Sequence, residues 1–450
     1  MPYPCPPPST SRGRRRVRVG VLGCGLIGAE HLRAWQAVER AAPGSVEITA
    51  LADTVAQHAE RCADQVAAWQ PRRPRVLASG MHLLDSGLVD GVDICLPVAD
   101  HQQAACAAAA RGLHVLVEKP LASTIAAGRA MVEAARAAGC VLSLAENHRR
   151  TLAIRTTGWL LQRGVIGTPY LVSAHRSRYE APAERPWHWR ASRSRGGGGW
   201  ALDNGAHLLD SWQYFFGPIH AVTATTSQVL QRRLTHPAHP TGWRLDERED
   251  LLAAMVSFTS GMTALLSCTS ALPGAERFAF TIQGDGGAIV DEGGQLFHAP
   301  LSSAHVHTRG HDASDSAGEG AGEGAGEGAG EGAGEDAGAR IADFQQPYLD
   351  SLTPSERERL FPHGLMDGFA IECAEFLRAI ADGAPVEITG DDGLRTLAAS
   401  LAFYESALIG ATVTVEEVAR ETIHAYQDTI TAPTPPLPGL RRNTTTGGTS

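Results

Sequence analysis

Short β-rich runs alternate with helical segments from Val17 to about Asn147, and this alternation constrains the fold more than any other feature. The runs are continuously apolar, and the segments between them are rich in alanine, which favours helices. Six strands are predicted, at Val17–Gly23, Val46–Asp53, Arg75–Ala78, Val92–Pro97, His114–Glu118 and Val141–Ala145. Apolar strands separated by helices indicate a parallel sheet that is covered on both faces. Residues 17–147 are therefore predicted to form a doubly wound α/β domain of the Rossmann type.

The second half of the chain, residues 148–431, has a different pattern and predicts an α+β domain. Helices are expected over Ala153–Arg163, Gly368–Ala381 and Asp392–Leu408. Strand-like runs lie between them, at Tyr170–Ser177, Ala221–Leu230, Leu251–Phe258, Met262–Ser270, Phe278–Gln283 and Gly287–Asp291. Because the connections between consecutive strands are short, antiparallel pairing is favoured. We expect a large, open and mostly antiparallel sheet.

A Gly-Glu-Gly-Ala repeat from Ala317 to Gly334 interrupts this second domain. It has no apolar side chain larger than alanine, so it predicts a disordered insert over residues 303–340. Residues 310–339 hold eight acidic residues and no basic one, and so supply most of the formal net charge of −10. A solvated linker explains the regular glutamates better than a calcium-binding tract does. Residues 1–16 and 432–450, rich in Pro, Ser, Thr, Gly or Arg, are also predicted to be disordered tails.

Composition excludes several classes of protein. An acidic balance argues against a nucleic-acid binder, and no apolar run approaches the roughly 18 residues that a membrane span needs. The eight cysteines contain no CxxC pair, which fits reduced thiols in the cytoplasm better than disulfides or a zinc site. Arg14-Arg15-Arg16 resembles the start of an export leader, but the apolar run that follows is short and carries Arg18, so we interpret it as a strand.

Gly23-Cys24-Gly25-Leu26-Ile27-Gly28 is a GxGxxG motif that follows the first predicted strand and opens an amphipathic helix. The first glycine permits a tight turn, the second lets the backbone approach a pyrophosphate, and the third allows close helix–strand packing. Unpaired N–H groups at the helix start, around Leu26 and Ile27, suit phosphates. Asp53 ends the second strand, where a carboxylate accepts ribose hydroxyls and repels a 2′-phosphate. We therefore predict NAD as the cofactor, with NADP as the less favoured alternative.

Lys119 is the only lysine in the chain, beside 38 arginines. It follows Glu118 at the carboxyl end of the fifth predicted strand, the edge where open α/β sheets bind ligands. An ammonium group there would hydrogen-bond an alcohol or carbonyl oxygen. Arginine is a poor substitute, because its guanidinium is bulky and does not deprotonate. A lysine without positional constraint would rarely fall at this strand end, so we predict a functional role for it.

A second chemical segment is Asp203-Asn204-Gly205-Ala206-His207. If residues 202–216 are helical, Asp203 and His207 are four residues apart and share one face. A carboxylate beside an imidazole fixes the ring's orientation and favours its protonated form, which suits general acid–base chemistry. The alternative is a plain surface contact. No third ligand stands at a recognisable spacing, so no metal site is predicted.

Together these segments resemble the Gfo/Idh/MocA family (glucose–fructose oxidoreductase, inositol dehydrogenase and rhizopine catabolism proteins). The shared pattern includes the GxGxxG motif, Asp53, Leu96-Pro97 followed by His101, Glu118-Lys119-Pro120, and Asp203 with His207. Leu96 stands where the family has threonine, which removes a hydroxyl from that position. The resemblance covers roughly residues 17–300 and 365–416, and it leaves out the repeat and both tails.

The resemblance implies that Lys119, Asp203 and His207 form a catalytic triad, in which His207 takes a hydroxyl proton while hydride passes to nicotinamide. It also implies that Leu96, Pro97, His101 and Glu118 line the cofactor, that the Lys119–Pro120 bond is cis, and that the open sheet forms a homodimer or homotetramer.

Residues that contact the substrate are harder to assign. Trp187 and Trp189 would close over a sugar or anchor a packed lid, and Arg149 and Arg176 would grip an acidic substrate or simply pair with surface acids.

The leading hypothesis is an NAD-dependent oxidoreductase that acts on a secondary hydroxyl of a sugar, cyclitol or related polyol. The alternatives are an NAD-dependent glycosidase that returns the hydride, and a dinucleotide-binding sensor or scaffold without turnover.

Overall fold

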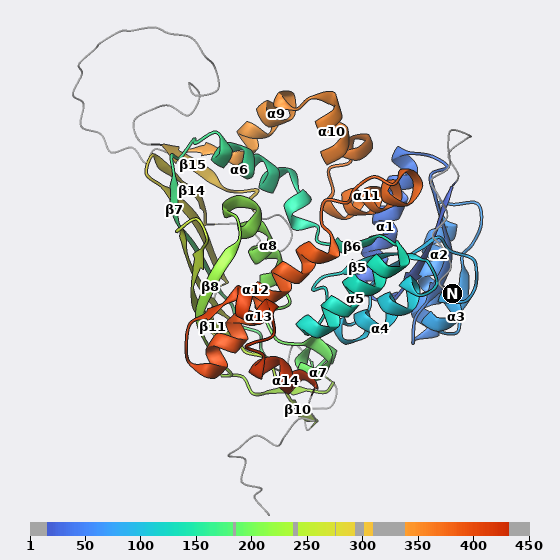
Figure 1. Cartoon of the computed structure of the whole chain (residues 1–450), viewed down its shortest axis with the longest axis horizontal. Coiled ribbons are helices and arrows are strands. Elements are labelled where there is room, and N and C mark those ends of the chain that lie inside the picture. Colours follow the sequence, from blue (N-terminus) through green and yellow to red (C-terminus); the bar gives the residue numbers. More distant parts are fainter. Residues whose placement is uncertain are drawn as a thin grey trace, which may run out of the picture.

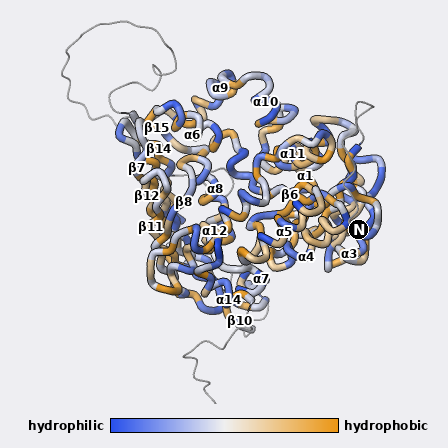
Figure 2. The backbone as a smooth tube through the Cα atoms, viewed as in Figure 1, coloured by the Kyte–Doolittle hydropathy of each residue, from blue (hydrophilic) through white to orange (hydrophobic). Residues whose placement is uncertain are grey.

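The computed structural model describes residues 16–182, 186–236, 242–274, 276–292, 301–308 and 338–431. Two sheets organise them, one with six strands and one with nine, and each is accompanied by helices (Figure 1). Hydrophobic positions are concentrated in the interior around α4, α5 and β6, whereas the strands of the larger sheet alternate between hydrophilic and hydrophobic residues (Figure 2). The smaller sheet is therefore buried on both faces, as a doubly wound sheet must be.

The first sheet is parallel and has the order β3-β2-β1-β4-β5-β6. Its strands are β1 (Val17–Leu22), β2 (Val46–Ala52), β3 (Arg75–Leu77), β4 (Gly91–Ile94), β5 (His114–Glu118) and β6 (Leu142–Ala145). The predicted Rossmann architecture is confirmed. The strand order reverses between β1 and β4, and the carboxyl ends of the strands at such a point form the crevice in which these sheets bind ligands.

Five helices connect these strands, namely α1 (Leu26–Ala41), α2 (Ala56–Ala67), α3 (Gly80–Leu84), α4 (Val98–Ala109) and α5 (Ile125–Ala138). A sixth helix, α11 (Gly368–Asp382), packs beside α1 although it comes from the second half of the sequence (Figure 1). Its buried residues Cys373 and Phe376 share a core with Leu32 and Trp35 of α1. This helix of the predicted second domain therefore covers the first sheet with its apolar face.

The second sheet has the order β16-β15-β14-β13-β7-β12-β11-β8-β17. Its strands are β7 (Pro169–Ser177), β8 (Ile219–Ser227), β11 (Leu251–Phe258), β12 (Thr263–Thr269), β13 (Arg277–Gly284), β14 (Gly287–Asp291), β15 (His305–Thr308), β16 (Ala339–Arg340) and β17 (Val413–Thr414). Every neighbouring pair is antiparallel except β7 with β12. This confirms the predicted, mostly antiparallel sheet.

Helices α6 (Leu152–Gln162), α8 (Gly205–Phe216) and α12 (Gly390–Ile409) lie on one face of the large sheet (Figure 1). The side chains of Tyr170, Met255 and Leu265 are exposed, at 54%, 54% and 46%. Met255 and Leu265 are direct cross-strand partners, and their chain neighbours Val256, Ala264 and Leu266 are buried. The strands therefore alternate as half-buried strands do, with exposed apolar side chains on the face away from the core.

The predicted insert 303–340 is too wide. Strands β15 and β16 occupy its two ends and pair with each other, with Val306 opposite Ala339. Val306 is almost fully buried, so the residues flanking the repeat have the alternating pattern of a strand. Residues 309–337, 1–15 and 432–450, where disorder is also predicted, lie outside the described residues.

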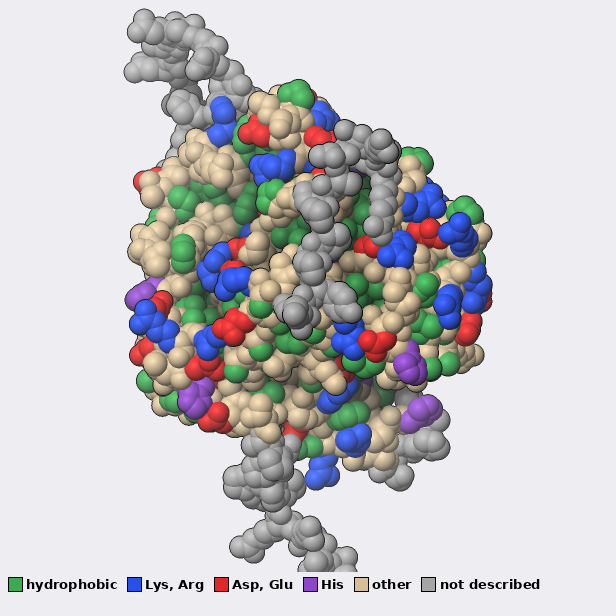
Figure 3. All heavy atoms as spheres, turned by 45° about the vertical axis from the view of Figure 1, so that its right-hand side comes forward, with side chains coloured by type: hydrophobic (Ala, Val, Ile, Leu, Met, Phe, Trp, Pro, Cys, Tyr) green, Lys and Arg blue, Asp and Glu red, His purple; other side chains and the backbone are tan. Residues whose placement is uncertain are grey.

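Further elements complete the described fold. They are a ribbon of β9 (Arg232–Leu234) and β10 (Trp243–Leu245), the helices α7 (Arg193–Gly196), α9 (Ile341–Ser351), α10 (Pro354–Leu360), α13 (Val415–Ala419) and α14 (Ala425–Thr431), and the 3-10 turns η1 (His148–Arg150), η2 (Trp189–Ala191) and η4 (Pro362–Gly364). In the described ranges, no helix combines the length and hydropathy needed to cross a membrane. Basic and acidic side chains are interspersed over the face drawn in Figure 3.

Candidate active site

The Gly-rich loop between β1 and α1 leaves space beside its middle glycine only. A Cβ on Gly23, whose φ is +92°, would lie 2.3 Å from the Cys95 oxygen, and one on Gly28 would lie 2.1 Å from the Gly23 oxygen. A Cβ on Gly25 would meet nothing within 4 Å. Two glycines thus pack the loop against the sheet, while the third borders open space from which a phosphate group reaches the backbone.

The start of α1 is arranged for an anion. No side chain caps Gly25, and no acidic residue stands in the first turn. The orphan N–H groups and the positive end of the helix dipole are therefore available to a pyrophosphate. Leu26, the first helical residue, is 89% exposed. An exposed leucine beside such a loop is expected where a bound dinucleotide would cover the side chain.

Asp53 follows β2 and faces the Gly-rich loop. Its Oδ2 accepts a hydrogen bond from the Cys24 N–H at 2.7 Å, and its Oδ1 accepts one from the Val55 N–H at 2.7 Å. The carboxylate is thereby fixed at the end of the strand where the ribose of a dinucleotide lies in this architecture. These donor and acceptor groups fit the cofactor that the sequence predicts.

Lys119 stands at the carboxyl end of β5 and reaches across to the second half of the chain. Its Nζ donates to the main-chain oxygen of Asp203 at 2.9 Å and to Asp203 Oδ1 at 3.0 Å. The Lys119–Pro120 bond is cis, as the resemblance implied. The only lysine of the chain therefore lies at the ligand-binding edge of the first sheet.

The sequence predicts Asp203 within a helix over residues 202–216. The observed helix α8 begins only at Gly205, so Asp203 precedes it. Its carboxylate is held by Lys119 and lies 3.4 Å from the Nε of Arg190. Burial would raise the pKa of Asp203, but the two cations, Lys119 first, hold it well below its ordinary value. Asp203 is therefore ionised, and its negative charge balances the positive charge of the Lys119 ammonium.

His207 has a different carboxylate partner from the one predicted. Its Nδ1 lies 2.7 and 2.8 Å from the two carboxylate oxygens of Glu146, which follows β6. Asp203 is occupied with Lys119, so the expected Asp203–His207 orientation is wrong. Burial and the Lys119 ammonium lower the pKa of His207 well below its ordinary value.

Glu146 is the residue that sequence reasoning missed. Its side chain is 1% exposed and its Oε1 also accepts a hydrogen bond from the His148 N–H at 3.0 Å. The signal was present, because Glu146 directly follows the predicted strand 141–145, at the same sheet edge as Lys119. An acid immediately after a buried strand is a reason to expect it among the chemical groups of that edge.

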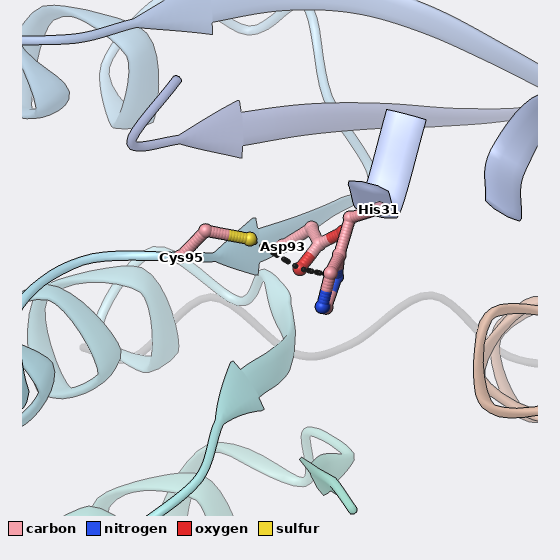
Figure 4. Close-up of side chains that lie close together, drawn as sticks. All are labelled: His31, Asp93 and Cys95. Atoms are coloured by element: carbon pink, nitrogen blue, oxygen red, sulfur yellow. Dashed lines mark hydrogen bonds and ion pairs between the residues drawn. The ribbon is translucent and has the colours of Figure 1, made fainter. Parts of the chain in front are cut away.

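Two clusters have a composition that suits metals, but their geometry does not. His148 and His207 stack, with centroids 3.8 Å apart and an interplanar angle of 11°, so their in-plane lone pairs do not converge on one ion. In the other cluster, His31 points at Asp93, with Cys95 beside it (Figure 4). Both ring nitrogens of His31 are engaged, Nδ1 with Asp93 and Nε2 with Glu118, each at 3.0 Å. We assign no metal to either cluster.

Comparison with known proteins follows the same division of the chain. Residues 17–146 match the model of an oxidoreductase family with an NAD-binding Rossmann fold, and residues 154–290 match the Gfo/Idh/MocA C-terminal domain. The chain belongs to the Gfo/Idh/MocA family of oxidoreductases.

Curated relatives of this Gfo/Idh/MocA protein include dehydrogenases of sugars. The D-apiose dehydrogenase of Paraburkholderia graminis is 29% identical over 264 residues, which are 58% of this chain and 63% of the relative. The levoglucosan dehydrogenase of Pseudarthrobacter phenanthrenivorans is 28% identical over 228 residues, which are 46% and 56% of the two chains. In both comparisons the match spans less than two thirds of the relative.

Solved structures share the fold over nearly their whole length. Levoglucosan dehydrogenase in complex with NADH has a TM-score of 0.69 at 23% identity and covers 89% of this chain and 99% of its own. An oxidoreductase domain protein from Kribbella flavida has a TM-score of 0.70 at 24% identity, with the same coverage. At this identity the likeness establishes the fold.

Other positions of the Gfo/Idh/MocA pattern connect the loops of the site. His101 is buried, with Nε2 2.9 Å from the Leu96 oxygen and Nδ1 3.1 Å from the Pro120 oxygen. It therefore joins the loop after β4, where Pro97 precedes α4, to the loop after β5. Glu118 is buried and accepts from His31, with a pKa lowered by that contact against the effect of burial. Both residues are almost fully buried, and their contact with the cofactor stays a prediction.

The two arginines proposed for substrate binding are paired within the protein. Arg149 forms a double hydrogen bond with the buried Asp210, and Arg176 lies 3.1 Å from Glu276. Arg176 thus pairs with an exposed acid, as the second interpretation expects, whereas the acid that pairs with Arg149 is buried and is not a surface acid.

The two tryptophans lie on a segment that reaches the catalytic candidates. Trp187 donates its Nε1–H to the Leu245 oxygen at 3.0 Å and packs under Arg244. Trp189 packs against Arg190, which approaches Asp203. The contacts of Trp187 fit an anchor of this segment, whereas those of Trp189 keep it beside the candidate site.

A pocket that is partly open to solvent borders His207 on the side of the second sheet. It is mostly apolar, and its polar lining residues include Asn204, Ser211 and His148. The apolar lining residues are Ile154, Leu208, Phe215, Phe278, Phe280 and Leu301. A pocket of this kind, lined by aromatic side chains with a few convergent polar groups, is the usual form of a small-molecule site.

Proposed function

We propose that this protein is an NAD-dependent oxidoreductase that oxidises a secondary hydroxyl of a sugar, cyclitol or related polyol. The observation that carries the proposal is the meeting of Lys119 and Asp203 at the carboxyl edge of β5, on the same side of the first sheet as the Gly-rich loop. His207 is close enough for its charge state to depend on both. A cation, a carboxylate and an imidazole beside a dinucleotide site are the groups that alcohol oxidation requires.

The chain's own groups divide the chemistry between them. NAD, when bound, supplies the nicotinamide carbon that accepts hydride. Lys119 donates a hydrogen bond to the hydroxyl oxygen and stabilises the developing alkoxide. Asp203 keeps the Lys119 ammonium in place. His207 receives the hydroxyl proton at Nε2, because its Nδ1 is bonded to Glu146.

The pocket beside His207 supports a sugar as the substrate class. Phenylalanines such as Phe278 and Phe280 suit the C–H face of a sugar ring, and Asn204 and His148 supply polar contacts for hydroxyls. A substrate with hydroxyls on every side would leave some of them unpaired against the apolar wall, at a cost of about 1–3 kcal/mol each. We therefore expect sugars with one apolar face or a blocked hydroxyl to be oxidised faster than acyclic polyols.

A substrate screen tests this function. Purified protein is incubated with NAD and single sugars, methyl glycosides, anhydrosugars, inositols and uronic acids, and the absorbance of reduced cofactor is followed. Formation of NADH with at least one sugar or cyclitol, and much slower formation with NADP, is the expected result. Cleavage of a glycoside without net NADH would instead favour the hydride-returning glycosidase, and no turnover with NAD bound would favour a sensor.

We further propose that the protein forms a homodimer or homotetramer in the cytoplasm. The exposed Tyr170, Met255 and Leu265 on the second sheet support association. Reduced thiols support the compartment, because the described cysteines form no disulfide.

A further inference from the structure

We infer that Glu146 is the positioning residue of His207: its carboxylate fixes the tautomer of the imidazole and stabilises the imidazolium that forms during turnover. This inference rests on the proposed function, in which His207 accepts the hydroxyl proton. Glu146 lies outside the motif Asp203-x-x-x-His207 that suggested the site, and it comes from the first sheet, 61 residues earlier in the chain.

The contact geometry leaves one protonation pattern for an active site. Both oxygens of Glu146 lie within 2.8 Å of His207 Nδ1. An ionised carboxylate only accepts hydrogen bonds, so Nδ1 must carry the hydrogen. The lone pair then resides on Nε2, the nitrogen that would face a substrate hydroxyl. The same logic governs a catalytic histidine whose second nitrogen is bonded to a buried carboxylate.

The surroundings of Glu146 hold it still. Its own main-chain oxygen accepts from Arg150 Nη1 at 2.6 Å, and its Oε1 accepts from the His148 N–H at 3.0 Å. The His148 ring stacks on His207 with centroids 3.8 Å apart. The imidazole is therefore fixed at Nδ1 by Glu146 and on one face by His148, and Nε2 has no hydrogen-bond partner among the described residues.

Oxidation moves one proton and one hydride. The substrate O–H bond breaks and an Nε2–H bond forms, so His207 becomes an imidazolium. The electron pair of the O–H bond forms the second bond of the carbonyl as the C–H bond breaks, and the hydrogen leaves carbon with its electron pair as a hydride that bound NAD would accept. A buried imidazolium without a counter-charge would be costly, and Glu146 supplies that charge at hydrogen-bond distance.

Charged groups from several elements act on this pair. Those that act on His207 are Lys119, Glu118 and Asp203. Those that act on Glu146 include His148, Lys119 and Arg149, and the buried acids Asp210 and Glu372 also interact with it. Burial raises the pKa of Glu146 and lowers that of His207, so both effects favour the uncharged forms.

The pH dependence of oxidation follows from this pair. When Glu146 takes up a proton at low pH, its hydroxyl donates to Nδ1 and the ring hydrogen moves to Nε2. His207 then has no lone pair for the substrate, so the rate falls as the pH decreases through the titration of the pair. Removing the titrating carboxylate should remove this limb of the profile.

The test combines kinetics with a spectroscopic measurement that needs no cofactor. In the free wild-type protein, ¹⁵N nuclear magnetic resonance at neutral pH should show His207 with its hydrogen on Nδ1; the Nε2–H tautomer would overturn the inference. Glu146→Gln should lower kcat about 10²-fold or more, leave the KM for NAD within a few-fold and abolish the acidic limb. Glu146→Asp should restore part of the kcat.

Glu405→Gln is the matched control, because Glu405 is a fully buried acid whose carboxylate accepts hydrogen bonds from the N–H groups of Tyr426 and Gln427. It should leave the pH profile unchanged. A Glu146→Gln protein with wild-type kcat and pH profile would refute the inference. If the wild-type chain oxidises no sugar at all, the proposed function fails, and the tautomer measurement alone decides the role of Glu146.

Discussion

The Lys119 ammonium donates two hydrogen bonds to Asp203, one to its main-chain oxygen at 2.9 Å and one to its carboxylate at 3.0 Å. Lys119 follows β5 of the first sheet, whereas Asp203 precedes α8, which packs on the second sheet. The two residues are 84 positions apart in the chain. The contact therefore joins the loop after β5 to the segment that precedes α8. A second ion pair joins the same two parts of the chain: Arg195 of α7 lies 2.7 Å from Asp100 of α4.

Alanine substitutions at Gly25 and at Gly28 of the phosphate loop should have opposite effects on cofactor binding and on stability. Gly25→Ala adds a methyl group to open space, so thermal stability should stay within a few degrees while NAD affinity falls, because the methyl takes space that the pyrophosphate needs. Gly28→Ala places a methyl 2.1 Å from the Gly23 oxygen and should destabilise the fold by about 1–3 kcal/mol. Thermal unfolding measures the stability of the two variants, and calorimetric titration measures their affinity for NAD. Equal loss of stability in the two variants would contradict this assignment of the loop.

Asp53 should decide between NAD and NADP. Asp53→Ala removes the negative charge that repels a 2′-phosphate, so the ratio of kcat/KM for NADP to that for NAD should rise at least tenfold. The variant also loses the acceptors for the Cys24 and Val55 N–H groups, so NAD binding should weaken. Asp53→Asn, which keeps an acceptor oxygen, is the control for that second effect. A parent protein that already prefers NADP would show the cofactor assignment to be wrong.

The first domain was predictable because its signals are local. Continuous apolar strands, Ala-rich helices and a GxGxxG motif between Leu22 and Ala29 each depend on nearby residues. The partner of His207 was not predictable in this way. A helical spacing suggested Asp203, but the chain turns before Gly205 and directs that carboxylate to Lys119. Glu146 reaches His207 because η1, which begins two residues after Glu146, packs against α8, and no local pattern records that contact.

The limits of the second domain show the same effect. Low complexity marks the Gly/Glu repeat, yet Val306 and Ala339 beside it pair as strands because the sheet edge supplies partners far away in sequence. Helix α11 joins the first domain because its apolar face matches α1. Tertiary contacts of this kind override boundaries drawn from composition.

The exposed cross-strand pair Met255–Leu265 should lie in the oligomer interface. Met255→Glu with Leu265→Glu places two carboxylates opposite each other on the open face of the sheet, so the assembly should dissociate to monomers. Leu408→Glu, on the 54% exposed Leu408 of α12, is the matched control and should keep the parent's mass. Analytical ultracentrifugation measures the mass of the parent protein, the double variant and the control. A parent that is already monomeric would contradict the proposed interface.

The central claim is that Lys119 acts on the substrate oxygen, and Lys119→Arg tests it most directly. The variant keeps a positive charge beside Asp203 but changes its shape and its distance from the hydroxyl. Steady-state formation of NADH on the best sugar of the screen, together with NAD binding by calorimetry, is the measurement. We predict that kcat falls about 10²-fold or more while NAD affinity stays within a few-fold. Unchanged turnover with the same sugar would contradict the account.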